Sequence, residues 1–402
     1  MRKSVVLAAL SLLLLPPAVE ARQYAILVGV WSYDHKEGLS SLPYAEANVK
    51  ELAEPLAWSG YEVTLLTEEV SDGAGSTRRN PRQPTRAGIM QALGAEYSPD
   101  DTVIFIFIGH GLTVKWSPTQ NDMRFHRELE ELQDARLMTC ICPKDCKSTD
   151  PSSMISYEAV AKILGKKGGA GNVFVFFDAC RQLNTQAGTD PGFEIPSRKD
   201  SLEPSVRAAF ACDQNRFAFY DDHLERSVFT HHLLNAFRGR GPAQGGELQF
   251  DQLFDWLQER VPVFESKDPK VGKQTPTQPD EDTSKGGYRR NGSVLRFPKK
   301  GSGRVIFGGN LPKNQRRKSF KNVTFQGKFS GTDFTHSVFE WCRFHECEFT
   351  DGAMFPGALM RDCELEECRF VHSKVRLLKL ENVRKSEVVF PTDEKPMTIQ
   401  LD

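Results

Sequence analysis

The sequence has no excess of charge of either sign and no long hydrophobic run beyond its first residues. Fifty-two lysines and arginines stand against 53 aspartates and glutamates, a formal net charge of −1. This balance gives no indication of a nucleic acid or an anionic membrane as the main partner. No later segment is apolar enough to cross a bilayer, which requires about 20 apolar residues. Partners therefore have to be inferred from individual sites.

The first 21 residues have the order of a secretory signal peptide. Basic Arg2 and Lys3 precede the apolar run Val5–Leu15, and the small residues Val19 and Ala21 mark a cleavage site. Cleavage is expected after Ala21, so the protein is expected to be exported, periplasmic or secreted, with no membrane partner afterwards. An uncleaved anchor is the alternative. No cysteine follows the apolar run closely, which argues against a lipid-modified N-terminus.

The chain has nine cysteines, an odd number for an exported protein. Cys140, Cys142 and Cys146 form one cluster, but a metal site would need a fourth ligand that the sequence does not supply nearby. A disulfide or plain loop cysteines are the simpler interpretations, and no metal is predicted. Four further cysteines cluster near the C-terminus, which leaves Cys180 and Cys212 apart.

Short strands and amphipathic helices alternate between residues 24 and 297. The runs Val103–Ile108 and Val173–Phe177 are apolar without alternation, which is typical of strands buried on both faces of a mainly parallel sheet. Ala25–Val30 and Val63–Leu66 predict two more strands. Helical spacing of apolar residues predicts helices around Val49, Leu52 and Leu56; Ile89 and Leu93; Phe229, Leu233 and Phe237; Phe250, Leu253, Phe254 and Leu257. The pattern indicates an α/β domain with helices flanking the sheet.

A five-residue period begins after a stretch rich in Lys, Pro, Gln, Thr, Asp and Gly. Large apolar residues stand five apart, and a small residue nearly always precedes each by two. One slip of a residue interrupts the period, and the large positions are Phe329, Phe334, Phe339, Phe344, Phe349, Met354 and Leu359, then Leu365, Phe370, Val375 and Leu380. Each unit can bury its apolar face only by stacking on the next, which is a solenoid signature.

This period resembles the pentapeptide-repeat family over Phe320–Leu380, and the resemblance implies a small right-handed quadrilateral β-helix. Cys342, Cys347, Cys363 and Cys368 would then fill its core. The predicted organisation is a signal peptide over 1–21, an α/β domain over 22–279, a linker over 280–318, the β-helix over 319–382 and a tail over 383–402.

A histidine and a cysteine follow the two fully apolar strands. Gly109, His110 and Gly111 come directly after the first, and Asp178 and Cys180 stand at the end of the second. Because parallel sheets bind ligands at the carboxyl ends of their strands, His110 and Cys180 are expected to meet at one edge. A histidine can activate a thiol as a nucleophile, and the N–H groups of Gly111 and Cys180 would face a developing oxyanion.

The motifs IGHG and FFDACR, with the flanking stretches YAILVGVWSYD, SVFTHHLLNAFRG and QTPTQP, resemble the caspase-like cysteine peptidases over residues 23 to 279. The resemblance implies that Cys180 attacks the scissile carbonyl and His110 protonates the departing amine. The sequence DACRQ and the 70-residue spacing favour the metacaspase and bacterial branch over animal caspases. In metacaspases an Asp two before the nucleophile, here Asp178, lines a pocket for Arg or Lys, and Asp213 loosely matches a second acidic position.

The segment Gln182–Ser201 is polar and matches the intersubunit linker of the family, so self-cleavage at Arg198 or Lys199 is a hypothesis. The charged region 113–150 is expected to be a solvated insertion, with a role in shaping the cleft as the alternative. No cofactor is predicted, and calcium activation, found in part of the family, is not readable here.

Two other functions remain open. The chain could be a catalytically silent caspase-fold scaffold whose repeat domain binds a protein partner, or a legumain- or clostripain-like peptidase. In the preferred interpretation the partners are protein or peptide substrates, together with an unidentified protein bound by the repeat domain. The numbers of acidic and basic residues in the repeats are nearly equal, which argues against DNA mimicry by this region.

Overall fold

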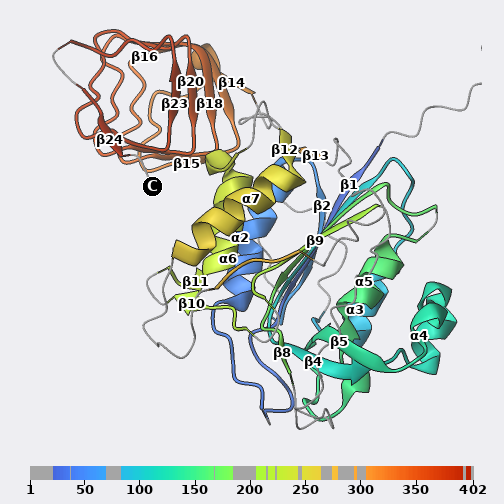
Figure 1. The fold of residues 1–402 in the computed structure, drawn as a ribbon. Helices are drawn as coiled ribbons and strands as arrows, with labels where there is room; N and C mark the ends of the chain where they lie inside the picture. The colour runs from blue at the N-terminus through green and yellow to red at the C-terminus, as the bar shows by residue number, and fades with distance from the viewer. Residues whose placement is uncertain are drawn as a thin grey trace, which may run out of the picture.

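Five parallel strands form the central sheet of the computed structural model, in the order β2-β1-β3-β7-β9 (Figure 1). The structure describes residues 21–36, 38–68, 83–166, 168–183, 205–213, 216–221, 224–242, 247–263, 274–278, 294–296, 305–392 and 395–399. The strands are β1 (Gln23–Gly29), β2 (Glu62–Leu66), β3 (Thr102–Ile108), β7 (Asn172–Asp178) and β9 (Val206–Phe210).

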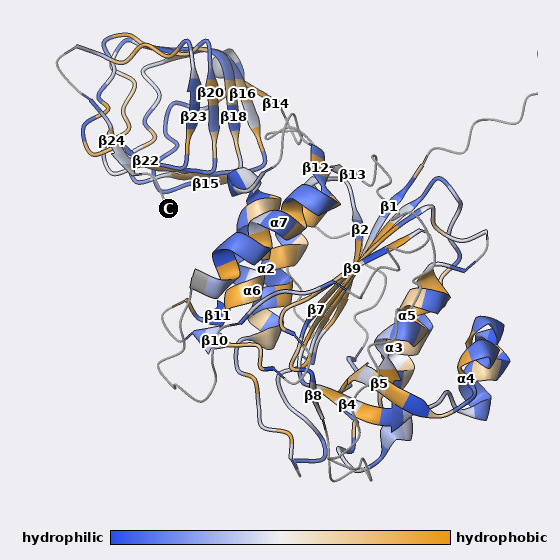
Figure 2. Cartoon of the chain, viewed as in Figure 1, coloured by the Kyte–Doolittle hydropathy of each residue, from blue (hydrophilic) through white to orange (hydrophobic). Residues whose placement is uncertain are grey.

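Helices cover both faces of this sheet. One face carries α3 (Arg86–Leu93) and α5 (Tyr157–Leu164), and the other carries α2 (Ala45–Trp58), α6 (Val228–Asn235) and α7 (Phe250–Arg260) (Figure 1). In β3, Phe105 and Phe107 are buried on the α3 side and Ile104 and Ile106 on the α2 side. Figure 2 shows the apolar residues gathered on the strands and on the helix surfaces turned towards them. The predicted sheet, buried on both faces, is confirmed.

Several of the helices begin at a residue whose side chain caps the first turn. Thr85 accepts a hydrogen bond from the N–H of Gly88 at the start of α3, and Ser227 accepts one from Thr230 at the start of α6. After α6 the chain forms a π-helical turn, Ala236–Arg240, in which Gly239 has a φ of 73°. None of the described helices is long and apolar enough to span a membrane.

Residues 113–150 belong largely to a second sheet, and the prediction of a solvated insertion is wrong. This sheet has the order β6-β5-β4-β8 and consists of β4 (Gly111–Trp116), β5 (Arg136–Ile141), β6 (Ile155–Ser156) and β8 (Gln182–Leu183). The connection also contains α4 (Gln120–Phe125) and a 3-10 helix, Arg127–Leu132, and another 3-10 helix spans Pro151–Ser153. Trp116, Leu129 and Leu132 are buried in the same core as α3 and α5, which explains why the region does not project into solvent.

Short elements complete the α/β part. They are β10 (Tyr220–Asp221), β11 (Arg226–Ser227), β12 (Glu247–Gln249), β13 (Val294–Arg296) and a 3-10 helix, Val261–Val263. Thr277 pairs with Phe210 at the free edge of β9. Gln274 is buried there, where it accepts from the N–H of Phe219 and donates to the carbonyl of Ala211. These contacts hold residues 274–278 against the edge of the sheet.

Residues 305–399 form two sheets of short parallel strands, here called the C-terminal strand region. The first sheet contains β14 (Val305–Phe307), β16 (Thr324–Ser330), β18 (Arg343–Thr350), β20 (Glu364–Glu366), β21 (Arg369–Phe370) and β23 (Arg384–Ser386). The second contains β15 (Ser319–Lys321), β17 (Val338–Glu340), β19 (Leu359–Arg361), β22 (Lys379–Glu381) and β24 (Met397–Ile399), and a 3-10 helix spans Gly308–Asn310. β14 pairs with β16, β23 with β20, and β24 with β22, so paired strands also lie outside residues 319–382.

Apolar side chains stack inside this region, with one correction to the predicted phase. Phe325 and Phe344 lie parallel with centroids 4.7 Å apart, as do Phe349 and Phe370 at 4.6 Å. The slip in the period comes directly after Phe349. The buried residues after it are Phe355 and Met360, whereas the predicted Met354 and Leu359 are only half-buried.

The four C-terminal cysteines are buried free thiols, as predicted for core filler. Each thiol lies within hydrogen-bonding distance of a carbonyl of a neighbouring strand. For example, the Sγ of Cys347 lies 3.1 Å from the carbonyl oxygen of Phe325. These thiols therefore stabilise the stack of strands from inside it.

One edge of the C-terminal strand region contacts the α/β part. Arg240, at the end of the π turn, makes two hydrogen bonds of 2.6 and 2.8 Å to the carboxylate of Asp362. Trp58, the last residue of α2, packs against Trp341 with ring centroids 5.9 Å apart. Asp362 is only 4% exposed, so this ion pair is largely removed from water. The contacts join the two parts through an aromatic pair and a buried salt bridge.

Candidate active site

The neighbouring strands β3 and β7 deliver His110 and Cys180 to the same edge of the sheet. Their register pairs Ile108 with Asp178, and the N–H of Gly109 donates to the carbonyl of Asp178 at 3.2 Å. His110 and Cys180 each follow two residues after that pair. They therefore lie at the same level on strands that are about 4.8 Å apart. Both side chains are partly exposed, so both are accessible from one side.

His110 is held by contacts on both its backbone and its ring. Its N–H donates to the hydroxyl of Tyr33 at 2.8 Å, and its carbonyl accepts from the N–H of Cys142 at 2.9 Å. The ring Nε2 lies 2.8 Å from the carbonyl oxygen of Ser40. A carbonyl only accepts, so this contact assigns the proton to Nε2 and leaves Nδ1 as a free acceptor. Burial lowers the pKa of His110, and the Ser40 contact partly offsets this.

The thiol of Cys180 is held in its neutral form. Burial raises its pKa, the backbone of Ala218 lowers it by hydrogen bonding, and the nearby charge of Asp178 raises it. Among the described residues, no hydrogen bond joins Cys180 to His110. The Cys180 thiol hydrogen-bonds instead to the backbone of Ala218, and the His110 ring contacts the carbonyl of Ser40. A neutral thiol beside a neutral imidazole requires proton transfer to the imidazole when the sulfur attacks, because little thiolate exists beforehand.

Two glycines beside His110 are required by close packing. A Cβ on Gly111 would meet the carbonyl oxygen of Cys180 at 2.4 Å, and one on Gly109 would meet the ring of Phe107 at 2.7 Å. Gly111 pairs with Ile141 of β5. In the next pair, the N–H of Cys142 donates a hydrogen bond to the carbonyl of His110. Since hydrogen-bonded pairs alternate in an antiparallel ladder, the N–H of Gly111 points away from β5.

Asp178 lies in the protein interior next to the predicted nucleophile. It is 1% exposed, and its Oδ2 accepts from the hydroxyl of Thr230 at 2.5 Å, whereas its Oδ1 has no partner among the described residues. Burial raises the pKa of Asp178 to about 6, and hydrogen bonds from Ser227 and Thr230 limit the rise. The carboxylate is therefore mostly ionised at neutral pH and has an oxygen available to a cationic group.

Asp213 is not brought together with Asp178 in the same way. Its side chain is exposed, on the loop that follows β9, and its carbonyl accepts from the N–H of Arg216. Burial lowers the pKa of the Arg181 guanidinium, and the charge of Asp213 is one of those that partly offset this. The structure thus separates the two predicted pocket acids into one buried and one exposed.

Arg181, which the sequence reasoning did not single out, ties together the segments around Cys180. It is buried, its guanidinium lies 4.2 Å from the centroid of the Phe210 ring, and it donates to Thr139 and Thr277. Burial lowers its pKa. The position immediately after the cysteine was the only sequence signal for this residue, because its partners come from distant segments.

Tyr220 was also missed, and its hydroxyl is a second unpartnered polar atom near Asp178. The Tyr220 Oη is buried and has no hydrogen-bond partner among the described residues. Burial raises its pKa well above the ordinary value, and the charges of Asp178 and Cys180 raise it further. Buried polar atoms are normally paired, so the Oδ1 of Asp178 and the Oη of Tyr220 are exceptions among the described residues.

Two further predictions, on self-cleavage and on the cysteine cluster, concern other parts of the chain. Arg198 and Lys199, the candidate self-cleavage positions, lie outside the described residues. Cys140, Cys142 and Cys146 are buried free thiols, and those of Cys142 and Cys146 are close enough to hydrogen-bond to each other. Within the described ranges, no group of three or more His, Cys, Asp or Glu side chains is arranged to hold a metal ion.

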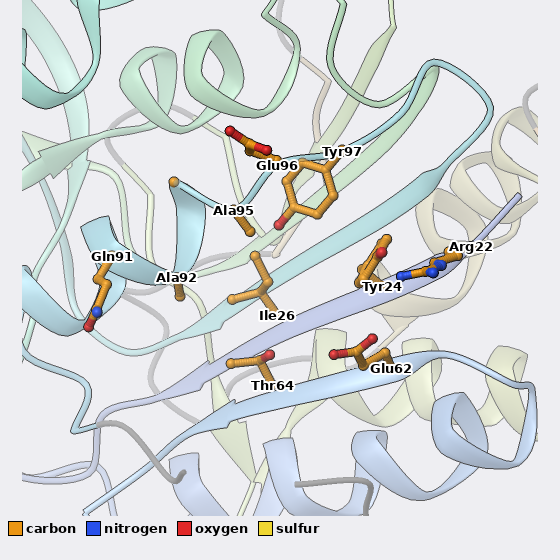
Figure 3. A pocket seen from close by; sticks show the side chains of 11 residues that line it. Arg22, Tyr24, Ile26, Glu62, Thr64, Gln91, Ala92, Ala95, Glu96 and Tyr97 are labelled. Carbon is orange, nitrogen blue, oxygen red and sulfur yellow. The ribbon is translucent and has the colours of Figure 1, made fainter. Parts of the chain in front are cut away.

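A cavity of about 440 Å³ lies at the opposite ends of the strands (Figure 3). Arg22 and Tyr24 line it from the start of β1, Glu62 from β2, and Tyr97 from the segment after α3. Arg22, Tyr24 and Glu62 lie at the amino ends of β1 and β2, whereas His110 and Cys180 follow the carboxyl ends of β3 and β7. The cavity is therefore separate from the candidate active site.

Comparison with known proteins identifies the family of the chain. The family model of the caspase domain matches residues 22–285, and the chain belongs to that family. Caspase-1 from Spodoptera frugiperda is 16% identical, with a TM-score of 0.43, over 64% of this chain and 86% of that one. A structural-genomics target from Geobacter sulfurreducens is 18% identical, with a TM-score of 0.39, over 63% of this chain and 97% of that one. A search of the curated proteins gives no match.

Proposed function

We propose that this caspase-family chain is an exported cysteine endopeptidase that cleaves after Arg or Lys, with Cys180 as nucleophile and His110 as its acid and base. The observation that carries the proposal is the register of β3 and β7, which sets His110 and Cys180 at one level of adjacent parallel strands. A scaffold has no physical need for this pair at the open edge of a sheet. Membership of the caspase family supports the same reaction class.

The protonation states define the steps of the reaction. The free Nδ1 of His110 accepts the thiol proton as Cys180 attacks the peptide carbonyl carbon. The N–H groups of Gly111 and Cys180 stabilise the oxyanion that forms. The imidazolium then donates its proton to the departing amine, and water hydrolyses the acyl-enzyme. The carbonyl of Ser40 keeps the imidazole in the required tautomer throughout.

The preference for a basic residue is supported by the buried carboxylate of Asp178. A guanidinium or ammonium entering beside Cys180 would bond to the unpartnered Oδ1 in a charge-assisted contact. Such a group would also replace the water lost from an ionised carboxylate that is 1% exposed. Asp213, being exposed, would contribute a weaker and more screened attraction at the rim.

The C-terminal strand region is proposed to be a right-handed quadrilateral β-helix of pentapeptide repeats that binds a protein partner. Parallel pairing relates Phe320 to Phe339, Phe339 to Met360, and Met360 to Leu380. Each step is 19 to 21 residues, close to four five-residue units, as expected for one coil with four sides. Self-cleavage at Arg198 or Lys199 and export by a leader over 1–21 complete the proposal.

Hydrolysis of fluorogenic peptides ending in Arg, Lys, Asp or Asn tests the peptidase directly. The mature protein and its Cys180→Ala and His110→Ala variants are compared under reducing conditions, with calcium and with a chelator. Cleavage after Arg or Lys that both variants lose is the expected result. Cleavage after Asn would instead support a legumain-like enzyme. A folded protein that cleaves no peptide, before or after limited proteolysis, would support the scaffold.

A further inference from the structure

At the end of the sheet opposite to His110 and Cys180, the backbone N–H of Arg22 hydrogen-bonds to a buried carboxylate. It donates to the Oδ1 of Asp101 at 2.9 Å, across 79 residues of sequence. The Oδ2 of Asp101 accepts from the N–H of Ser98 at 2.7 Å, and the carbonyl of Arg22 accepts from Thr102 at 2.9 Å. Asp101 is 3% exposed. The contact therefore fixes the start of β1 next to the start of β3.

This carboxylate makes no close ion pair among the described residues, although its charge, after the hydrogen bond to Tyr24, is one of those that raise the pKa of the Arg22 guanidinium. Its hydrogen-bond donors are two backbone amides, and no Lys or Arg side chain of the described residues forms a salt bridge with it. The guanidinium of Arg22 hydrogen-bonds to Tyr24 instead, along the wall of the cavity in Figure 3. Carboxylates as buried as this one are usually paired with a positive charge.

The nitrogen that Asp101 accepts from is the one that signal cleavage would release. Val19 and Ala21 place the cleavage between Ala21 and Arg22. Hydrolysis of that bond adds one water, which leaves a carboxylate on Ala21 of the leader and an α-ammonium on Arg22. The cleavage pattern and the buried Asp101 are independent observations, and both involve the backbone nitrogen of Arg22.

We propose that removal of the leader turns the Arg22–Asp101 hydrogen bond into a partly buried ammonium–carboxylate pair, which anchors β1 in the mature protein and is absent from the precursor. The inference rests on the proposed export. The hydrogen bond in the precursor already has an ionised acceptor, and cleavage adds a positive charge on the donor, so the mature pair gains a direct Coulombic attraction. The precursor therefore folds less stably than the mature protein, which suits a chain that must cross a membrane before it folds.

A cycle of four proteins tests the pair. Two begin at Arg22, with Asp101 or with Asp101→Asn, and two carry a Gly-Ser-Ala21 extension with the same two residues at position 101. Thermal unfolding is measured for all four. Asp101→Asn is expected to lower the Tm of the form that begins at Arg22 by at least about 2–4 °C more than that of the extended form. Equal losses in both backgrounds would overturn the proposal.

Two further measurements separate this inference from the proposed function. N-terminal sequencing of protein exported by a bacterial host is expected to read Arg22, Gln23, Tyr24, and any other start would remove the basis of the pair. Peptide hydrolysis by the folded Asp101→Asn protein is expected to match that of the unchanged protein, because Asp101 precedes β3 and His110 follows it. A failure of the peptidase assay would leave the stability cycle unaffected.

Discussion

Asp178→Asn is expected to make the protein more stable and less active at once. In the unchanged protein burial raises the pKa of Asp178 from 3.8 to about 6. A difference of roughly two pKa units corresponds to about 3 kcal/mol of cost for holding the ionised form in the native state. The Asn side chain avoids this cost and can still accept the hydrogen bond from Thr230. Its new N–H group, if unpaired, takes back about 1–2 kcal/mol.

The stability gained through Asp178→Asn must increase with pH. The native state binds the Asp178 proton more tightly than the unfolded state, so the contribution of this group lowers stability as pH rises from about 4 to 6. Asp178→Asn is therefore expected to raise the free energy of unfolding by about 2–3 kcal/mol more at pH 7 than at pH 4, because the cost of an unpaired N–H group is the same at both pH values. Urea unfolding at the two pH values measures this difference. Asp213→Asn, which changes an exposed carboxylate, is the matched control and should change stability by less than about 0.5 kcal/mol.

Activity is expected to change in the opposite sense. Loss of a charge-assisted bond to substrate, worth about 1.5–3 kcal/mol, reduces kcat/KM for Arg peptides by about 10- to 150-fold. The acid limb of the pH profile near pH 6 should also lose the contribution of Asp178, and the remaining limb reports His110. An unchanged preference for Arg, or a stability difference that is the same at pH 4 and pH 7, would refute the reasoning.

Two other substitutions test the packing around the site and between the two parts of the chain. Gly111→Ala places a Cβ 2.4 Å from the Cys180 carbonyl oxygen, so we expect about 1–3 kcal/mol of destabilisation by urea unfolding and loss of most peptide hydrolysis. Asp362→Asn breaks a largely buried pair with Arg240 and should cost about 3 kcal/mol by the same measurement, whereas Lys328→Met, at an exposed 4.0 Å pair, should cost less than about 1 kcal/mol.

The elements that the sequence predicted best are those governed by local pattern. Apolar runs such as Val103–Ile108 gave the buried strands, and the glycines and polar residues after them gave their ends. His110 and Cys180 could be placed together because parallel strands end at one edge whatever their order in the sheet. The catalytic role assigned to them stays a prediction until hydrolysis is measured.

The residues that were missed depend on contacts between distant segments. Ser40 acts through a backbone carbonyl, which any residue type could supply, and it lies 70 positions from His110. Region 113–150 has enough charged residues to suggest a solvated insertion, but alternate residues such as Trp116 and Met138 point into the core once β4 and β5 pair. Charge content along the sequence does not reveal which face of a strand is covered.

The phase error in the repeats has the same origin. Phe349, Met354 and Leu359 keep perfect five-residue spacing, and nothing local distinguishes Met354 from Phe355 as the buried residue. The stacking of strands determines which residue is buried, because Phe355 packs against Phe334, 21 residues earlier, with ring centroids 5.1 Å apart. The one extra residue is accommodated in a turn where Asp351 and Gly352 both adopt positive φ. Exchanging the two side chains by Met354→Phe and Phe355→Met should therefore destabilise the region, although composition and apolar content are unchanged.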